Sequence, residues 1–300
     1  MCLYPKSEKV AGWLKDGPLL LDGGGGTSLH PPGIDQGPPV DLWNLTFPDQ
    51  VLELHRRFVA AGSDVILTNS FGANRFRLAR FDAAEKTADV NRRAAEIARA
   101  AAGRGRLVFG SIGPAGVSLA KGEASRRDLF DAFVEQARAL ADAGVDGLVI
   151  ETMTDTAELY EAVRAAKGTG LPVAACMTFG FGKENDLTAA GVTPEEAAEA
   201  VLESGADIVG ANCGAGTKGF LSICRRFRAA CGLPIWMKPS AGIPRLVGDK
   251  LFYDQSAGEF AAEAVKLFDA GALFVGGCCG ASPAYIEELR KLLDRRRARR

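Results

Sequence analysis

Eight short apolar runs alternate with helix-like segments along the chain, and this alternation limits the possible folds more than any other feature. The runs do not alternate apolar with polar residues, which is typical of strands buried on both faces of a parallel sheet. They are LLLDGG at 19–24, DVILTNS at 64–70, LVFGSIG at 107–113, GLVIETM at 147–153, PVAACMTF at 172–179, DIVGANC at 207–213, PIWMKPS at 234–240 and LFVGGCC at 273–279.

The segments between the runs carry the start and stop signals of helices. Their starts show capping boxes or a serine followed by proline; these are Asp155 with Glu158, Thr193 with Glu196, Ser256 with Glu259, and Ser282 with Pro283. Their ends show a glycine that can cap a helix in a left-handed conformation; these are Gly62, Gly144, Gly205 and Gly271. Eight strand and helix pairs in 300 residues predict one α/β domain over 1–300, a (β/α)8 TIM barrel.

Composition narrows the class of protein. The formal net charge is −1, so we expect no nucleic-acid partner, and we interpret the basic tail as a last amphipathic helix. The first residues contain no apolar core of signal-peptide length, and no later run reaches the length of a membrane span, which predicts a cytoplasmic protein without a membrane partner. In that reducing compartment seven cysteines favour free thiols or metal ligands over disulfides.

The Pro- and Gly-rich segment at 27–47 predicts a long loop over one end of the barrel.

Polar residues follow the apolar runs at the places where the predicted strands end. In this fold the carboxyl ends of the strands form the active site. The residues at those ends are Asp22, Gly23, Gly24, Thr68, Asn69, Glu151, Asn212, Cys213, Cys278 and Cys279. We therefore expect them to surround one site.

Three of these residues are cysteines, and together they indicate a metal site. Three thiolates suit a tetrahedral zinc ion whose fourth position is left for substrate. Cys278 and Cys279 can both face one ion only if the strand has ended and the chain bends, as Gly276, Gly277 and Gly280 allow. A disulfide between the neighbours, acting as a redox switch, is the alternative.

The remaining cysteines and the two histidines give weaker signals. Cys176, Cys224 and Cys231 are interpreted as packing residues, and Cys2 is given no role. His30 lies in the predicted loop and His55 is expected on the polar face of a helix, so histidine-based nucleophilic catalysis has little support. A Gly-x-Gly-x-x-Gly pattern at 214–219 lacks an acidic ribose partner and is interpreted as a chance match.

The other strand ends suggest what binds beside the metal. Asp22 precedes four glycines, whose amides can approach a carboxylate closely, although a flexible turn has the same pattern. Glu151 ends an apolar run and needs a cationic partner, for which a substrate ammonium is one candidate. A thiophilic metal, a carboxylate loop and acids for an ammonium together describe a site for a thiol amino acid.

Motifs along nearly the whole chain resemble those of the homocysteine S-methyltransferase family. They are LDGGGGT, TNSFGAN, GSIGP, the ET pair at 151–152, GANC and GGCCG. The resemblance implies that Cys213, Cys278 and Cys279 bind zinc and that Asp22 and Glu151 hold homocysteine together with the glycine-loop amides. The implied reaction is methyl transfer to the homocysteine thiol, giving methionine.

The resemblance leaves the methyl donor and the acceptor open. TNSFGAN and MTF look more like the methionine synthase members than the betaine-dependent ones, which implies a methylcobalamin donor on a separate corrinoid protein. The alternatives are S-methylmethionine or betaine as donor, or a thiol-binding module of a split methyltransferase. Gly25 stands where members of the family usually have a larger residue, and Ser240 stands where they often have asparagine. Another small thiol is therefore also a candidate acceptor.

Overall fold

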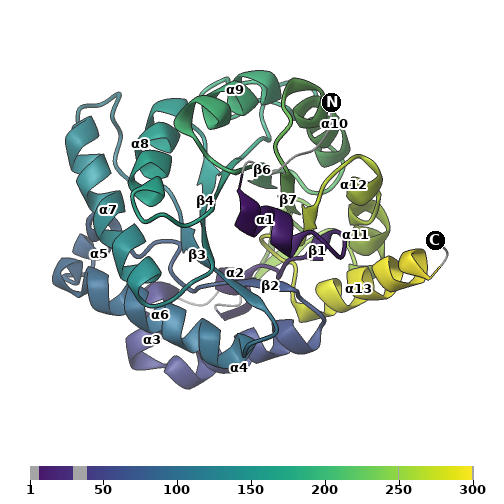
Figure 1. Ribbon diagram of the computed structural model, residues 1–300, viewed down its shortest axis with the longest axis horizontal. Helices are drawn as coiled ribbons and strands as arrows, with labels where there is room; N and C mark the ends of the chain where they lie inside the picture. Colours follow the sequence, from purple (N-terminus) through teal and green to yellow (C-terminus); the bar gives the residue numbers. More distant parts are fainter. Residues whose placement is uncertain (1–6, 30–38, 249, 299–300) are drawn as a thin grey trace.

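A computed structural model describes residues 7–29, 39–248 and 250–298, and eight of its strands form one parallel sheet (Figure 1). The order is β1-β10-β7-β6-β5-β4-β3-β2, and a bridge between Leu21 and Val65 joins its two edges. The strands are β1 Leu19–Leu20, β2 Val65–Leu67, β3 Leu107–Ile112, β4 Gly147–Met153, β5 Val173–Met177, β6 Ile208–Cys213, β7 Ile235–Pro239 and β10 Phe274–Val275. Each lies inside one predicted run, and the predicted (β/α)8 barrel is confirmed.

Helices surround the barrel as an outer ring (Figure 1). The main ones are α4 Pro48–Ala60, α6 Thr87–Ala102, α7 Arg126–Asp142, α8 Thr156–Lys167, α9 Pro194–Ser204, α10 Phe220–Ala230, α11 Ala257–Ala264, α12 Lys266–Asp269 and α13 Pro283–Arg297. The capping boxes that open α9 and α11 are both formed. Asp155 caps α8, but Glu158 does not complete a box, because its carboxylate accepts a hydrogen bond from the Ala115 amide instead. Pro283 begins α13 without a side-chain hydrogen bond from Ser282.

Several shorter elements were not predicted. The expected loop at 27–47 contains helical turns in its described part, so the prediction of a loop is wrong there. Residues 30–38, which include His30, lie outside the described residues, and so does Cys2. The turns are α2 Gly25–Leu29, η1 Val40–Leu42 and α3 Trp43–Thr46. The others are α1 Glu8–Trp13, α5 Arg75–Ala79, η2 Ala84–Lys86, and an antiparallel hairpin of β8 Pro244–Val247 and β9 Lys250–Tyr253. Short turns carry too few periodic positions to stand out in a sequence.

Large apolar side chains fill the inside of the barrel. Trp236 lies between Phe109 and Phe274, with ring centroids 5.2 Å apart in each pair. Trp13 of α1 packs edge-on against Phe109 at 5.4 Å and closes the amino-terminal end of the barrel, where α1 covers the centre of the ring (Figure 1). Cys176 packs in the same cluster, as predicted. The filled interior leaves the carboxyl ends of the strands as the place for a site.

A repeated aspartate holds neighbouring strands together at the amino-terminal end. Asp64, Asp146 and Asp207 directly precede β2, β4 and β6. Each carboxylate accepts a hydrogen bond from the backbone of a neighbouring strand, at Leu20, Val108 and Val173 respectively, over 2.7 to 2.8 Å. Each also pairs with a cation from a surrounding helix, which is Arg290, Arg99 or Lys167 respectively. The repeated phrase of glycine and then aspartate before a strand therefore has a structural role.

Candidate active site

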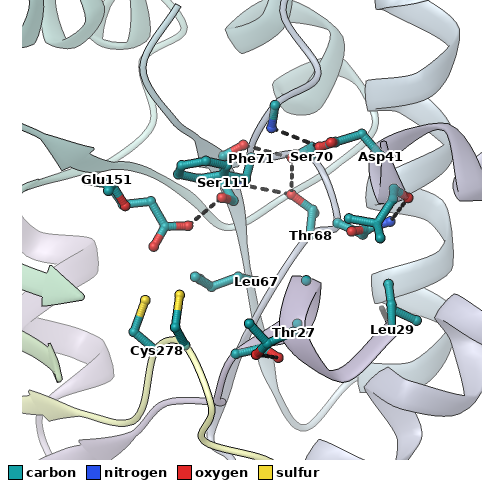
Figure 2. A pocket seen from close by; sticks show the side chains of 18 of the residues that line it. Thr27, Leu29, Asp41, Leu67, Thr68, Ser70, Phe71, Ser111, Glu151 and Cys278 are labelled. Atoms are coloured by element: carbon teal, nitrogen blue, oxygen red, sulfur yellow. Dashed lines mark hydrogen bonds between the residues drawn. The ribbon is translucent and has the colours of Figure 1, made fainter. Parts of the chain in front are cut away.

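A cavity of about 600 Å³ opens at the carboxyl ends of the strands. This size is typical of small-molecule sites. Nine of the ten residues predicted for the site line the cavity, and Asn212 lies behind its wall. Figure 2 shows Cys278 and Glu151 near the same space, with Thr68 and Ser111 on the adjoining wall.

The three strand-end cysteines meet at the floor of this cavity. The sulfurs of Cys213, Cys278 and Cys279 all lie within 4.8 Å of one another, and those of Cys213 and Cys279 are 3.6 Å apart. Three sulfurs bound tetrahedrally to zinc at about 2.3 Å would be separated by about 3.8 Å. The donor set and its spacing therefore fit a thiophilic metal ion with one open position.

Two different backbone features bring the sulfurs together. Cys213 and Gly280 adopt left-handed conformations, with φ of 64° and 79°. Gly276 is required by close packing instead, because a Cβ atom there would lie 2.5 Å from the Asp22 carbonyl oxygen and 2.6 Å from Leu21 Cβ. A non-glycine residue in the left-handed region costs about 1 to 3 kcal/mol, and such residues gather at functional sites.

The three thiols share their protons. Hydrogen bonds from Cys278 and Cys279 lower the pKa of Cys213, and the same contacts with Cys213 raise the pKa values of Cys278 and Cys279. Without a metal the cluster therefore gives up its first proton readily and resists further ionisation. A cation at the cluster would remove that resistance.

Asn212 supports the cysteines from behind the cavity wall. Its side-chain oxygen accepts a hydrogen bond from the Thr152 amide at 2.7 Å, and its nitrogen donates to Thr152 Oγ1 at 2.7 Å and to Cys278 Sγ at 3.8 Å. Ser240 likewise donates to Cys213 Sγ at 3.6 Å. Asn212 is thus placed to position Cys278.

Lys238, on β7, is a site residue that the sequence interpretation missed. Its side chain is 2% exposed and its Nζ lies 2.5 Å from Asp22 Oδ1. The other Asp22 oxygen accepts a hydrogen bond from the Leu67 amide at 2.8 Å. Burial lowers the pKa of Lys238, but the charges of Asp22 and Glu151 outweigh it, so the pKa is raised overall and the lysine is protonated. A signal was available, because this lysine ends an apolar run just as Glu151 does.

Glu151 lies on β4, two residues before the end of the strand, and lines the same cavity. Its carboxylate accepts a hydrogen bond from Ser111 Oγ at 2.5 Å (Figure 2). Burial raises its pKa, and the nearby Lys238 charge partly opposes that shift. A cationic partner was expected for Glu151, with a substrate ammonium as one candidate; the protein itself supplies a cation in Lys238.

The glycine loop packs against the cysteine loop. A Cβ atom on Gly23 would lie 2.0 Å from the Ala281 carbonyl oxygen, and one on Gly24 would lie 2.5 Å from that of Cys278. The Gly24 amide donates to Ala281 at 2.9 Å, and Gly280 donates to Thr27 Oγ1 at 3.1 Å. These glycines are thus needed for packing, and the Gly24 amide is already bonded within the protein.

Thr68 and Asn69 line the cavity but bond mainly to the protein. Thr68 Oγ1 lies 2.6 Å from Ser70 Oγ and accepts from the Ser111 amide at 3.0 Å (Figure 2). The Asn69 side chain donates to the Val40 carbonyl at 2.6 Å and to Asn44 at 3.2 Å. Both residues therefore fix the shape of the wall.

The prediction for His55 is wrong. The side chain is buried beside the cavity, and neither ring nitrogen has a hydrogen-bond partner within the part of the chain that the structure describes. Burial lowers its pKa to about 4, against a smaller opposing effect of Asp22, so the imidazole is neutral near pH 7. The spacing of Val51, Leu54, His55 and Phe58, all buried on α4, is the signal that could have placed it inside.

A barrel with three converging cysteines at the carboxyl ends of its strands defines the class of protein: a TIM-barrel protein with a candidate thiolate metal centre. The homocysteine S-methyltransferase family model matches residues 19–293. The chain belongs to this family.

Curated relatives include the methionine synthases of Mycobacterium leprae (strain TN) and Mycobacterium tuberculosis (strain ATCC 25618 / H37Rv). Each is 32% identical over 263 residues, which cover 83% of this chain. The chain matches only 22% of the length of either methionine synthase.

The fold is shared with solved structures. The metallated form of the homocysteine methyltransferase MmuM from Escherichia coli has a TM-score of 0.76 at 22% identity, covering 95% of this chain and 100% of that one. The 3-dehydroquinate dehydratase from Geobacillus kaustophilus HTA426 has a TM-score of 0.54 at 11% identity, covering 94% and 91%. Within the described ranges, none of the helices has the length and apolar character of a membrane span.

Proposed function

We propose that this protein transfers a methyl group to the thiol of homocysteine, giving methionine, with zinc bound by Cys213, Cys278 and Cys279. The observation that carries the proposal is the convergence of these three sulfurs at the floor of the cavity, in a member of this family. When bound, zinc lowers the pKa of a thiol at its open position and so keeps the sulfur a nucleophile near neutral pH.

The surrounding residues supply binding and orientation. Asn212 and Ser240 hold Cys278 and Cys213 in place through their hydrogen bonds to sulfur. The polar end of the acceptor meets Glu151, the Asp22 and Lys238 pair and the backbone of the glycine loop, all of which line the same cavity. Thr68 and Asn69 shape the wall against which the acceptor lies. Contacts of this kind hold the thiol in line with the donor carbon.

The metal proposal is tested by zinc analysis of protein purified under reducing conditions. We expect about one zinc per chain in the wild type and little or none in Cys278→Ala. Cys224→Ala is the matched control, because that thiol is buried on α10 away from the cavity and its loss should leave the zinc content unchanged. Freshly purified, reduced wild-type protein without zinc would refute the proposal.

The donor is proposed to be a methylcobalamin carried by a separate corrinoid protein. The support is the similarity to methionine synthases. A donor screen with homocysteine, scored for methionine, tests it. Turnover with S-methylmethionine or betaine as the sole donor would overturn the corrinoid proposal.

The second candidate function is a thiol-binding module that is inactive alone. It is favoured by one observation, that the chain matches only 22% of the length of the methionine synthases. Inactivity with free donors, rescued by a methylated corrinoid protein, would identify the chain as one half of a split methyltransferase. Turnover with a free donor would exclude the module.

A further inference from the structure

The Asp22 and Lys238 pair changes what the cavity can recognise. Both Asp22 oxygens already have donors, one from the Lys238 ammonium and one from the Leu67 amide. The pair is buried, with side chains 2% and 5% exposed. An acceptor ammonium at Asp22 would therefore have to compete with the ammonium of the protein itself.

Lys238 also alters the charge that faces the acceptor. The charged groups of the cavity wall are the carboxyl groups of Asp22, Asp41 and Glu151 and the cations Lys238, Arg77 and Arg80, and of these cations Lys238 is the one that pairs with Asp22. Without the lysine, an acceptor carboxylate beside Asp22 and Glu151 would face the negative charges of these two residues. With the lysine in place, a carboxylate in that position has a cation to approach, and Glu151 remains for an acceptor ammonium.

We propose that Lys238 is a specificity residue that takes the ammonium position at Asp22, so that the site selects small thiols by their carboxylate group more than by their amino group. The inference rests on the proposed function, because it concerns the thiol acceptor of the same site. It extends the acceptor class to thiol acids that lack an α-amino group.

A panel of three thiols tests the proposal by calorimetric binding to the wild-type, zinc-loaded protein. Homocysteine carries both groups, 4-mercaptobutyrate lacks the amine, and 3-mercaptopropylamine lacks the carboxylate. We expect 4-mercaptobutyrate to bind within about tenfold of homocysteine, and 3-mercaptopropylamine to bind at least about tenfold more weakly than 4-mercaptobutyrate, the size of effect that one charge-assisted contact produces.

The outcomes separate this proposal from the proposed function. If homocysteine binds but the aminothiol binds as tightly as the thiol acid, or more tightly, the role of Lys238 is refuted and the proposed function stands. If none of the three thiols binds, the proposed function fails as well.

Two variants give an independent test. Lys238→Met frees Asp22 and should move the preference at least about tenfold toward the aminothiol. Because that variant leaves a buried carboxylate unpaired, the double variant Asp22→Asn, Lys238→Met removes both charges together and should bind the thiol acid no better than the aminothiol. An unchanged preference in the folded double variant would overturn the proposal.

Discussion

Replacing His55 by leucine should remove a measurable part of the acid sensitivity of this protein. The imidazole is 4% exposed, and neither nitrogen has a partner among the described residues. Burial lowers its pKa from 6.5 to about 4. In the unfolded chain the same group titrates near 6.5.

The sign and size of the change in stability with pH follow from the difference between the pKa values of His55 in the folded and unfolded chain. Between pH 6.5 and pH 4 the unfolded chain binds more protons than the folded one, so stability falls as the pH falls through this window. A difference of about 2.5 pKa units corresponds to about 3 kcal/mol in full, and to about 2 kcal/mol between pH 7 and pH 5. Near pH 7 the imidazole is neutral in both the folded and the unfolded state. The His55→Leu change should there leave the free energy of unfolding nearly unchanged or raise it, because leucine leaves no buried nitrogen unpaired.

Urea unfolding at pH 7, 6 and 5, followed by tryptophan fluorescence, measures the effect. Chelator and reductant keep metal loss and thiol oxidation out of the comparison. The free energy of unfolding of the wild type should fall by about 2 kcal/mol more than that of His55→Leu over this range. Buried carboxyl groups with raised pKa values, such as Glu151, act in the opposite direction but are common to both proteins.

His30→Leu is the comparison variant, since the chain has two histidines and this change reports the contribution of the other one. Parallel stability curves for wild type and His55→Leu, within about 0.5 kcal/mol, would show that His55 is not held neutral by burial.

The remaining predictions concern the frame of the barrel and are also read from urea unfolding. Asp207→Ala leaves the Val173 amide and Lys167 without their shared acceptor and should lower the free energy of unfolding by about 2 kcal/mol. Asp89→Ala, at an exposed ion pair, should lower it by less than about 0.5 kcal/mol. Equal effects of the two changes would refute the structural role of Asp207. Gly276→Ala should lower the free energy of unfolding by about 3 kcal/mol, because the added Cβ atom would collide with the backbone at Asp22. Gly25→Ala should be tolerated, because no atom lies within 4 Å of its added Cβ. A Gly276→Ala protein as stable as the wild type would contradict the close packing at this position.

The sequence by itself determined the architecture and the location of the candidate site. Strand and helix signals are local, so the eight runs and the capping boxes of α9 and α11 could be recognised one at a time. The carboxyl ends of parallel strands meet at one edge by geometry alone. For that reason Cys213, Cys278 and Cys279 could be expected together although more than sixty residues separate the first from the others.

Only the tertiary structure decided which side chains are already paired. Lys238 meets Asp22 because β10 pairs with both β7 and β1 and so holds their carboxyl ends close together, although 216 positions of chain separate the two residues. The Gly24 amide bonds to Ala281 because the first and last strands, β1 and β10, are also neighbours. Such contacts depend on packing between distant segments, whereas sequence periodicity reports only which face of an element is buried.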